Sequence, residues 1–351
     1  MVNWEFQKGK YVRDPRLGHR FGINYKGGYD SIDASVNTYQ LGTDSNGFIH
    51  NGSPKSKNII KKANNIHRVI ILGGSLAMGM GASKNERTIA AILEKKLNLK
   101  HKIKFEVLNA ACGGYCSWHS VIKLSMEVIR LKPDTIIEIS GWNDMMHSSW
   151  GNKKNGNWIE NHDRSIEDVA TALLSLQGKL SFNDFISYKL KLSKPYLLAK
   201  KALLSLFGKN FSMQDISWGH DKNTLKLRQE GVENYINNLY TLNGICQAHQ
   251  IRFIHLLQPN PIWKSNKLRK SKDFISEDIN LHLKRYKNFS ELSKNYLKNL
   301  RKYYKKFKNI KKQVYIDLSD SRKFKDTDWI DHCHLSDAGQ EKLSDIIIEK
   351  F

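Results

Sequence analysis

The chain has 351 residues and is 40% hydrophobic, which is enough to bury a sizeable core and excludes disorder as a description of the whole chain. Its formal net charge is +23, yet 44 of its 57 basic residues are lysine, whereas nucleic-acid-binding proteins favour arginine at bases and phosphates. We therefore expect no nucleic-acid partner. Compositional bias explains much of the charge, and contact of the lysines with an anionic surface or a membrane periphery is the alternative.

The four cysteines are too few and too scattered for a disulfide framework, and Cys112 and Cys116 lack the spacing and the second Cys/His pair of a zinc site. We expect neither a metal nor another cofactor. The N-terminal segment has no apolar run of the kind a signal peptide needs, and no stretch of about 18 apolar residues predicts a spanning helix. These features favour a cytoplasmic location.

The first 65 residues are rich in Gly, Asn, Asp and Tyr without helical periodicity, which predicts loops and short strands in an N-terminal extension that packs on the core. From residue 66 to residue 351, strands and helices alternate. Apolar or alternating segments predict strands at residues 68–72, 104–108, 135–140, 251–257 and 313–317. Helical spacing predicts helices at residues 86–99, 117–131 and about 337–350, the last with Ser336 as its N-cap. This alternation indicates an α/β fold, a three-layer α/β/α domain around a five-stranded parallel sheet.

The regular pattern breaks between the third and fourth predicted strands. Residues 150–223 contain basic amphipathic stretches and are too many for a loop in a compact domain. We interpret them as a helical insertion over the active edge of the sheet. The insertion serves either as a lid or substrate-binding cap, or simply as a covering of the sheet.

Four short motifs lie where such a sheet would gather them, because active sites of parallel sheets lie beyond the carboxyl ends of the strands. Ser75 follows the first strand within Gly73-Gly74-Ser75, Gly114 follows the second strand and Asn143 follows the third. Asp331 and His334 precede the last helix. Taken singly, each motif has an ordinary structural explanation, since Gly, Ser and Asn are common in turns.

Together these residue types suit acyl transfer. A serine hydroxyl flanked by glycines is open to a substrate, while a glycine N–H and an asparagine amide can donate to an oxyanion. A carboxylate three residues before a histidine can hold the far ring nitrogen, which favours His334 over its neighbour His332 as the partner of Asp331.

In this order and position, Gly73-Gly74-Ser75, Gly114, Gly141-x-Asn143-Asp144 and Asp331-x-x-His334 resemble the four sequence blocks of the SGNH (GDSL-like) hydrolase superfamily. The resemblance runs from about residue 69 to residue 351. It implies a flavodoxin-like fold, Ser75 as nucleophile in a triad with His334 and Asp331, and an oxyanion hole formed by Ser75, Gly114 and Asn143. One departure is Gly74, where the GDS signature has an aspartate that is not part of the triad.

The resemblance implies an enzyme that hydrolyses an ester, and we favour an O-acetyl ester of a carbohydrate in a bacterium. Tyr115, Trp118 and Trp142 are candidates to stack on a sugar ring, although core packing explains them nearly as well. Aliphatic runs at residues 196–198 and 203–206 would instead suit an acyl chain. A lipid-ester hydrolase, a thioester hydrolase or an O-acyltransferase therefore stays open.

Three other classes fit less well. An α/β-hydrolase usually takes its acid and histidine from separate loops, whereas Asp331 and His334 share one. A nucleotide-binding protein would need a phosphate-binding glycine motif that is not in place. A non-catalytic basic binding protein would use the lysines around residues 298–312, where the interleaved aromatic residues are explained equally well as the buried face of a helix.

Overall fold

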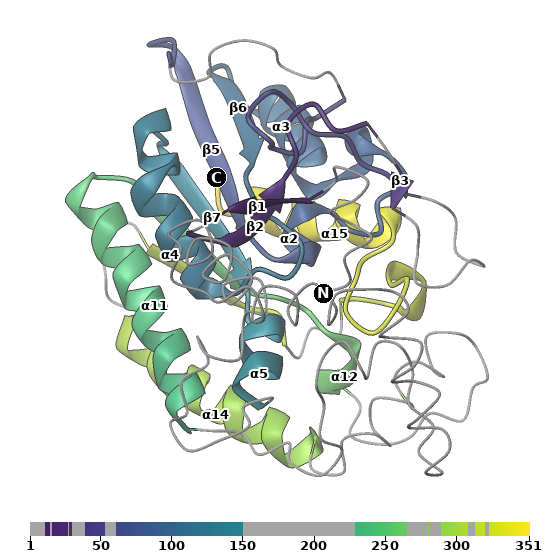
Figure 1. Cartoon of the computed structure of the whole chain (residues 1–351), viewed down its shortest axis with the longest axis vertical. Coiled ribbons are helices and arrows are strands. Elements are labelled where there is room, and N and C mark those ends of the chain that lie inside the picture. The colour runs from purple at the N-terminus through teal and green to yellow at the C-terminus, as the bar shows by residue number, and fades with distance from the viewer. Residues whose placement is uncertain are drawn as a thin grey trace, which may run out of the picture.

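The structure is a computed structural model and describes residues 11–14, 16–26, 28–29, 39–52, 61–149, 229–264, 280, 289–307, 313–319 and 323–351. Its centre is a parallel sheet in the order β6-β5-β7-β8-β9 (Figure 1). The strands are β5 (Ile66–Gly73), β6 (Lys104–Asn109), β7 (Thr135–Ser140), β8 (Arg252–Leu257) and β9 (Gln313–Asp317). Counted from β5, this is the 2-1-3-4-5 order of flavodoxin-like sheets. The predicted α/β class and five-stranded parallel sheet are confirmed.

Both faces of the sheet are covered, because successive side chains of a strand point to opposite sides. In β5, Val69 and Ile71 belong to one core cluster and Ile70 and Leu72 to the other, and all four are fully buried. Figure 1 shows the helices that complete these clusters on the two sides of the strands. They are α3 (Ile89–Lys100) and α15 (Asp337–Ile348) on one side, with α4 (Ser117–Met126), α11 (Gln229–Ala248) and α14 (Phe289–Phe307) on the other. The fold therefore has three layers.

Helix boundaries follow local capping. The predicted helix 86–99 is divided at Thr88, whose side chain accepts the N–H of Ala91 and starts α3 after the short 3₁₀ turn Asn85–Arg87. The predicted helix 117–131 ends at Met126, because Glu127 leaves helical geometry before the 3₁₀ turn Val128–Leu131. At the other end of the chain, α15 begins after Ser336, whose hydroxyl accepts the N–H of Gly339 as an N-cap should.

The N-terminal region contains two short antiparallel pairs. β1 (Tyr11–Asp14) pairs with β2 (Gly18–Phe21), and β3 (Gly28–Tyr29) pairs with β4 (Tyr39–Gln40). Tyr11, Leu17 and Phe21 lie in the same core cluster as residues of α3 and α15. The β1–β2 hairpin is thus part of the hydrophobic core, while the predicted boundary at residue 65 stays a prediction.

The predicted insertion at residues 150–223 lies outside the described residues, and so do its two aliphatic runs. In the part of the chain that is described, no helix combines the length and the apolar character needed to cross a bilayer.

Candidate active site

Ser75 is presented by a sharp strand-to-helix turn. It is the first residue of α2 (Ser75–Met78), two positions after the end of β5, and it is partly exposed while the rest of α2 is buried. Gly73 has a φ of +135°, and a Cβ added there would lie 2.1 Å from the carbonyl oxygen of Ile139. Only glycine allows β5 to run this close to β7 while making the turn. The turn therefore places the Ser75 hydroxyl at the carboxyl edge of the sheet.

The Ser75 hydroxyl meets a histidine that is 259 residues further along the chain. His334 Nε2 lies 2.7 Å from Ser75 Oγ, and His334 Nδ1 lies 2.5 Å from Asp331 Oδ2. The other carboxylate oxygen of Asp331 accepts the backbone N–H groups of Cys333 at 2.8 Å and His334 at 2.7 Å. The structure thus brings together all three residues that the sequence analysis placed in the triad.

Two sets of contacts hold the His334 loop against the turn that follows α2. Gly81 has a φ of +99°, and a Cβ there would lie 2.2 Å from the carbonyl oxygen of Leu335. Ser83 donates from its backbone N–H and its hydroxyl to the two carboxylate oxygens of Asp337, at 2.8 and 2.6 Å. The separation of Ser75 and His334 therefore depends on backbone contacts as well as on the triad itself.

The hydrogen bonds of Asp331 define its protonation state. Burial alone would raise the pKa of this carboxyl group, but the charge and hydrogen bond of His334 hold it well below its usual range. An ionised carboxylate only accepts hydrogen bonds, so the proton of the imidazole lies on Nδ1. Nε2 is then left to accept the hydroxyl proton of Ser75, which is the arrangement that a general base requires.

The predicted oxyanion residues lie beside Ser75. Asn143, on α5 (Trp142–Ser149), donates from Nδ2 to the carbonyl oxygen of Tyr115 at 2.9 Å. A Cβ added to Gly74 would lie 2.7 Å from this Nδ2 atom and 2.9 Å from the same carbonyl oxygen. The loops after β5, β6 and β7 therefore meet next to the nucleophile, with Gly114 in the second of them. A side chain at Gly74 would collide with both atoms, which explains why this position is a glycine.

Asn109, which the sequence analysis did not single out, supports this arrangement from below. It ends β6 and is fully buried, and its amide Nδ2 lies 3.3 Å from the carbonyl oxygen of Ala77 and 3.1 Å from that of Met78. Its Oδ1 accepts the N–H of Ala111 at 3.2 Å. Asn109 thus joins the short helix that carries Ser75 to the loop that carries Gly114. The signal in the sequence that could have identified Asn109 is a polar amide at the end of a buried strand.

Asp144 joins α5 to the start of α4. One of its oxygens accepts from the backbone N–H of Ser117 at 3.0 Å and from the Ser117 hydroxyl at 2.6 Å. Asn238 also donates to this hydroxyl, at 3.0 Å. Burial raises the pKa of Asp144 to about 7, although the hydrogen bonds from Ser117 oppose the shift. The residue next to Asn143 is therefore protonated in the folded protein at mildly acidic pH.

The raised pKa of Asp144 predicts a specific pH dependence of stability. Between about pH 4 and pH 7 the unfolded state loses the proton while the folded state keeps it, so the free energy of unfolding falls by up to about 1.4 kcal/mol per pH unit from this group. Asp144→Asn keeps the acceptor for Ser117 but cannot ionise. In urea titrations we expect its stability relative to the wild type to increase from pH 5 to pH 7. A difference that stays constant over this range would contradict the assignment.

A second serine–histidine–carboxylate group lies under the site but is closed to solvent. His255 Nε2 is 3.1 Å from Glu138 Oε2 and 3.5 Å from Ser140 Oγ. The hydroxyl of Tyr235 lies 2.9 Å from the same nitrogen. Glu138 and His255 are fully buried and Ser140 is 3% exposed. This group therefore cross-links β7 and β8 inside the core and does not meet a substrate.

All three aromatic residues suggested for sugar stacking are buried. Tyr115 is 1% exposed and its ring stacks on His119, with centroids 4.4 Å apart. Trp118 is also buried and packs on the ring of His119. The rings of Tyr115 and Trp118 are therefore packed in the core. Trp142 is 5% exposed and belongs to a core cluster, and its ring centroid is 5.4 Å from that of His332, two residues before His334.

One group of side chains has the spacing of metal ligands among the described residues. Asp331, His332 and Cys333 place one ligand atom each within 4.8 Å of one another. Both oxygens of Asp331 already bond to the His334 loop. A metal ion held there would compete with His334 for this carboxylate, so the group fits the triad better than a metal centre.

Comparison with known proteins gives structural neighbours only. No family model matches the chain, and no curated protein matches it by sequence. The chain is similar to the structure of the acetyl xylan esterase AlAXEase, with a TM-score of 0.41 and 13% identity over 81% of this chain and 98% of that one. It is also similar to a lipase from a goat rumen metagenome, with a TM-score of 0.44 and 13% identity over 80% and 96%. A GDSL-like lipase from Bacteroides thetaiotaomicron gives 0.41 and 9% over 81% and 87%. The site described above depends on its own contacts and not on these neighbours.

Proposed function

We propose that the chain is a serine esterase of the SGNH (GDSL-like) hydrolase type. The observation that carries the proposal is the continuous chain of hydrogen bonds from Ser75 Oγ through the ring of His334 to Asp331, at 2.7 and 2.5 Å. Ser75 and His334 are partly exposed at the carboxyl edge of a parallel sheet, where a substrate can reach them. The buried group around His255 also contains a serine and a carboxylate, but it lacks this access.

The mechanism follows from the proton positions. Ser75 Oγ attacks the ester carbonyl carbon while its proton passes to His334 Nε2, and Asp331 stabilises the imidazolium that forms. The carbonyl oxygen becomes an oxyanion that the N–H groups of Ser75 and Gly114 and the amide of Asn143 hold. Collapse of this intermediate breaks the C–O bond, and the leaving alcohol takes the proton from His334. Water then attacks the acyl-enzyme by the same steps and releases the acid.

Asn143 gives a prediction for the oxyanion hole. One N–H of its amide bonds to the Tyr115 carbonyl oxygen at 2.9 Å, and the other N–H is the proposed donor to the oxyanion. Removing one such donor costs about 10²–10³ in rate, so Asn143→Ala should lower kcat by about this factor with a smaller change in KM. Asn237→Ala, at an exposed position of α11, is the control and should keep full turnover. Unchanged turnover of Asn143→Ala would remove this residue from the hole.

For the substrate, we propose an O-acyl ester of a carbohydrate. Trp142 adjoins Asn143 and is 5% exposed, and its ring centroid lies 5.4 Å from that of His332 and 6.4 Å from that of Trp263. Trp263 in turn lines a cavity of about 430 Å³. Aromatic rings next to a polar cleft suit a sugar, which offers both apolar faces and hydroxyl groups. A lipid ester, a thioester or transfer of the acyl group to an acceptor other than water is the alternative.

The cavity also bears on the charge of the ligand. Its other wall is the exposed face of α14, where Lys294, Lys298, Arg301, Lys302 and Lys305 follow helical spacing. Among the described residues, only Arg301 of these five forms an ion pair, with Asp317 at 2.9 Å. The aromatic residues Tyr296 and Tyr303 lie on the buried face of the same helix. Carbohydrates that carry carboxylate groups are therefore the anionic ligands that we propose for this face.

A substrate panel tests this assignment. It contains p-nitrophenyl esters from acetate to palmitate, a neutral acetylated oligosaccharide and an acetylated oligosaccharide of uronic acids, each assayed at low and high salt. We expect the highest kcat/KM with the acetylated sugars, and a salt-sensitive preference for the uronic acid substrate. Preference for long acyl chains would contradict the carbohydrate assignment. Recovery of the acyl group on an added alcohol, instead of as free acid, would identify a transferase.

A further inference from the structure

The β1–β2 hairpin contacts the proposed oxyanion loop through His19. This side chain is 1% exposed, and its Nε2 lies 2.8 Å from the carbonyl oxygen of Gly113. In the opposite direction, the Tyr115 hydroxyl donates to the carbonyl oxygen of His19 at 2.6 Å. The two hydrogen bonds hold Gly113 and Tyr115, the residues on either side of Gly114. A residue of the N-terminal region thus holds the loop that the mechanism uses.

The hydrogen bond to the Gly113 carbonyl oxygen also fixes the direction of the Gly114 N–H group. The carbonyl oxygen of Gly113 and the N–H of Gly114 belong to one peptide unit, which is planar and trans, so the two groups point in opposite directions. A donor that holds the oxygen on the core side therefore turns the Gly114 N–H toward the opposite side. That N–H is the backbone donor that the proposed mechanism needs from this loop.

The loop needs the hydrogen bond from His19 because it contains two successive glycines, Gly113 and Gly114. Two successive glycines allow the peptide between them to rotate by a half turn at low conformational cost, and Gly114 already has a φ of +80°. Rotation would replace the Gly114 N–H with the Gly113 oxygen at the oxyanion position. A larger residue at position 113 would displace Tyr11, because its Cβ would lie 2.4 Å from the Tyr11 hydroxyl oxygen.

His19 is in the protonation state that this hold requires. Burial lowers the pKa of His19 to about 4, although the bond to Gly113 opposes the shift, so the ring is neutral at physiological pH. A carbonyl oxygen only accepts hydrogen bonds, and the single ring proton is therefore on Nε2. Nδ1 has no hydrogen-bond partner among the described residues.

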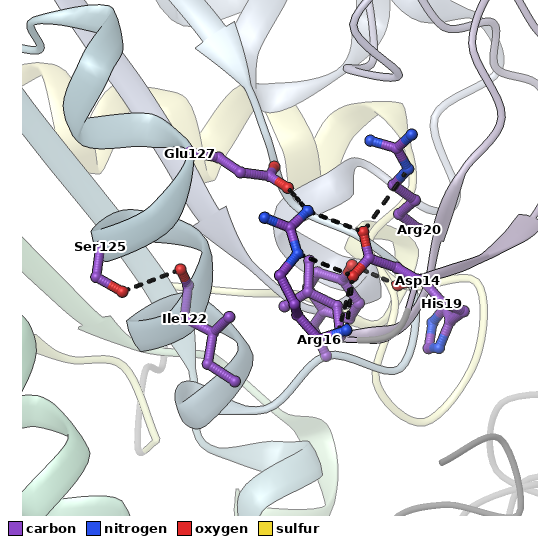
Figure 2. A network of polar contacts seen from close by, with 9 residues as sticks. Asp14, Arg16, His19, Arg20, Ile122, Ser125 and Glu127 are labelled. Atoms are coloured by element: carbon purple, nitrogen blue, oxygen red, sulfur yellow. Dashed lines mark hydrogen bonds and ion pairs between the residues drawn. The ribbon is translucent and has the colours of Figure 1, made fainter. Parts of the chain in front are cut away.

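The hairpin that carries His19 is itself anchored to the domain. Figure 2 shows Arg16 between Asp14 on β1 and Glu127 at the end of α4. The guanidinium nitrogen Nη2 lies 3.1 Å from Asp14 Oδ2 and 2.7 Å from Glu127 Oε1. Asp14 also accepts the backbone N–H groups of Arg16 and Leu17 at 2.9 and 3.2 Å, which closes the turn between the strands. The hairpin therefore presents His19 from a fixed base.

We propose that His19 is a positioning residue that locks the Gly113–Gly114 peptide with the Gly114 N–H directed at the oxyanion. This inference rests on the proposed esterase function. The N-terminal hairpin then contributes to turnover, although it lies outside the four sequence blocks. His19 does not itself touch the substrate, because its side chain acts through the backbone of Gly113 and Gly114.

Two pairs of variants test the lock, with p-nitrophenyl acetate as substrate. His19→Gln keeps an N–H close to the position of Nε2, whereas His19→Asn is too short to reach Gly113 and His19→Leu has no donor. We expect kcat to fall by about 10- to 100-fold in the Asn and Leu variants with KM nearly unchanged, and the Gln variant to recover most of it. Phe21→Leu loosens the same hairpin without removing a donor, and should lower Tm while keeping kcat.

An NMR measurement reports directly on the orientation of the Gly113–Gly114 peptide. In enzyme labelled with ¹⁵N-glycine and phosphonylated at Ser75 by a fluorophosphonate, the Gly114 amide proton should move downfield in the wild type and in His19→Gln. It should not move in His19→Asn. If all His19 variants keep wild-type kcat and this shift while Ser75→Ala is inactive, the lock is wrong and the esterase assignment stands. If the wild type takes no label on Ser75, the esterase assignment fails and the lock fails with it.

Discussion

Ser75→Ala should lower the turnover of p-nitrophenyl acetate by at least about 10⁴-fold, because loss of a triad nucleophile removes the covalent route and leaves only the binding and oxyanion terms. The structure offers a matched control in Ser140, which also lies within reach of a histidine and a carboxylate. Ser140 is 3% exposed inside the core, so Ser140→Ala should reduce stability and keep kcat within about threefold of the wild type.

The two serine variants together decide which histidine acts as the base. Full activity in Ser75→Ala would contradict the assignment whatever the control does. A loss of kcat in Ser140→Ala as large as that in Ser75→Ala, with the protein folded by circular dichroism, would mean that the group around His255 is needed for chemistry. Neither result is compatible with Ser75 Oγ at 2.7 Å from His334 as the reacting pair.

Asp331→Asn is the second variant with a large expected effect. The asparagine side chain keeps the shape of the aspartate, but it cannot offer two acceptor oxygens and does not hold the proton on His334 Nδ1. Loss of the correct tautomer costs about 10⁴ in kcat in serine hydrolases with this geometry. Asp345→Asn, at an exposed position of α15, should retain wild-type turnover and serves as the control. A tenfold or smaller loss in Asp331→Asn would contradict the orienting role.

The pKa of Asp331 adds a constraint on the pH profile. Because His334 holds this pKa well below its usual range, Asp331 stays ionised throughout the range in which esterases are assayed. A fall of kcat/KM of the wild type between pH 7 and pH 5 therefore reports protonation of a group other than Asp331. Asp331→Asn should show its loss of kcat at every pH in this interval, and restored activity at either end would contradict the account.

The sequence predicted the sheet well because its strands are short and largely apolar, and β5, β7 and β8 are buried along most of their length. β7 and β9 begin and end at the predicted residues, and the other three strands differ by up to two residues at an end. Helices were harder, since capping by Thr88 and the irregular backbone at Glu127 divide segments whose apolar spacing looks continuous. These breaks depend on single side-chain and backbone conformations that periodicity does not record.

The same contrast holds for the site. Asp331 and His334 are three residues apart, so their pairing is local and visible in the sequence. His19 is different, because it bonds to a backbone oxygen 94 residues away and lies in a segment without periodicity. The pairing of Glu138 with His255 depends on the register of β7 against β8, and the burial of Tyr115 depends on the stack with His119. Only tertiary structure supplies such contacts.

Identification of the residue that becomes covalently modified tests the central claim most directly. The wild-type protein is treated with a fluorophosphonate, and the adduct is located by mass spectrometry of intact protein and of peptides. We expect one phosphonyl group per chain, on Ser75, with its formation abolished in Ser75→Ala and slowed in Asp331→Asn. Modification of a different serine, or undiminished labelling of Ser75→Ala, would contradict the assignment of Ser75, His334 and Asp331 as the catalytic triad.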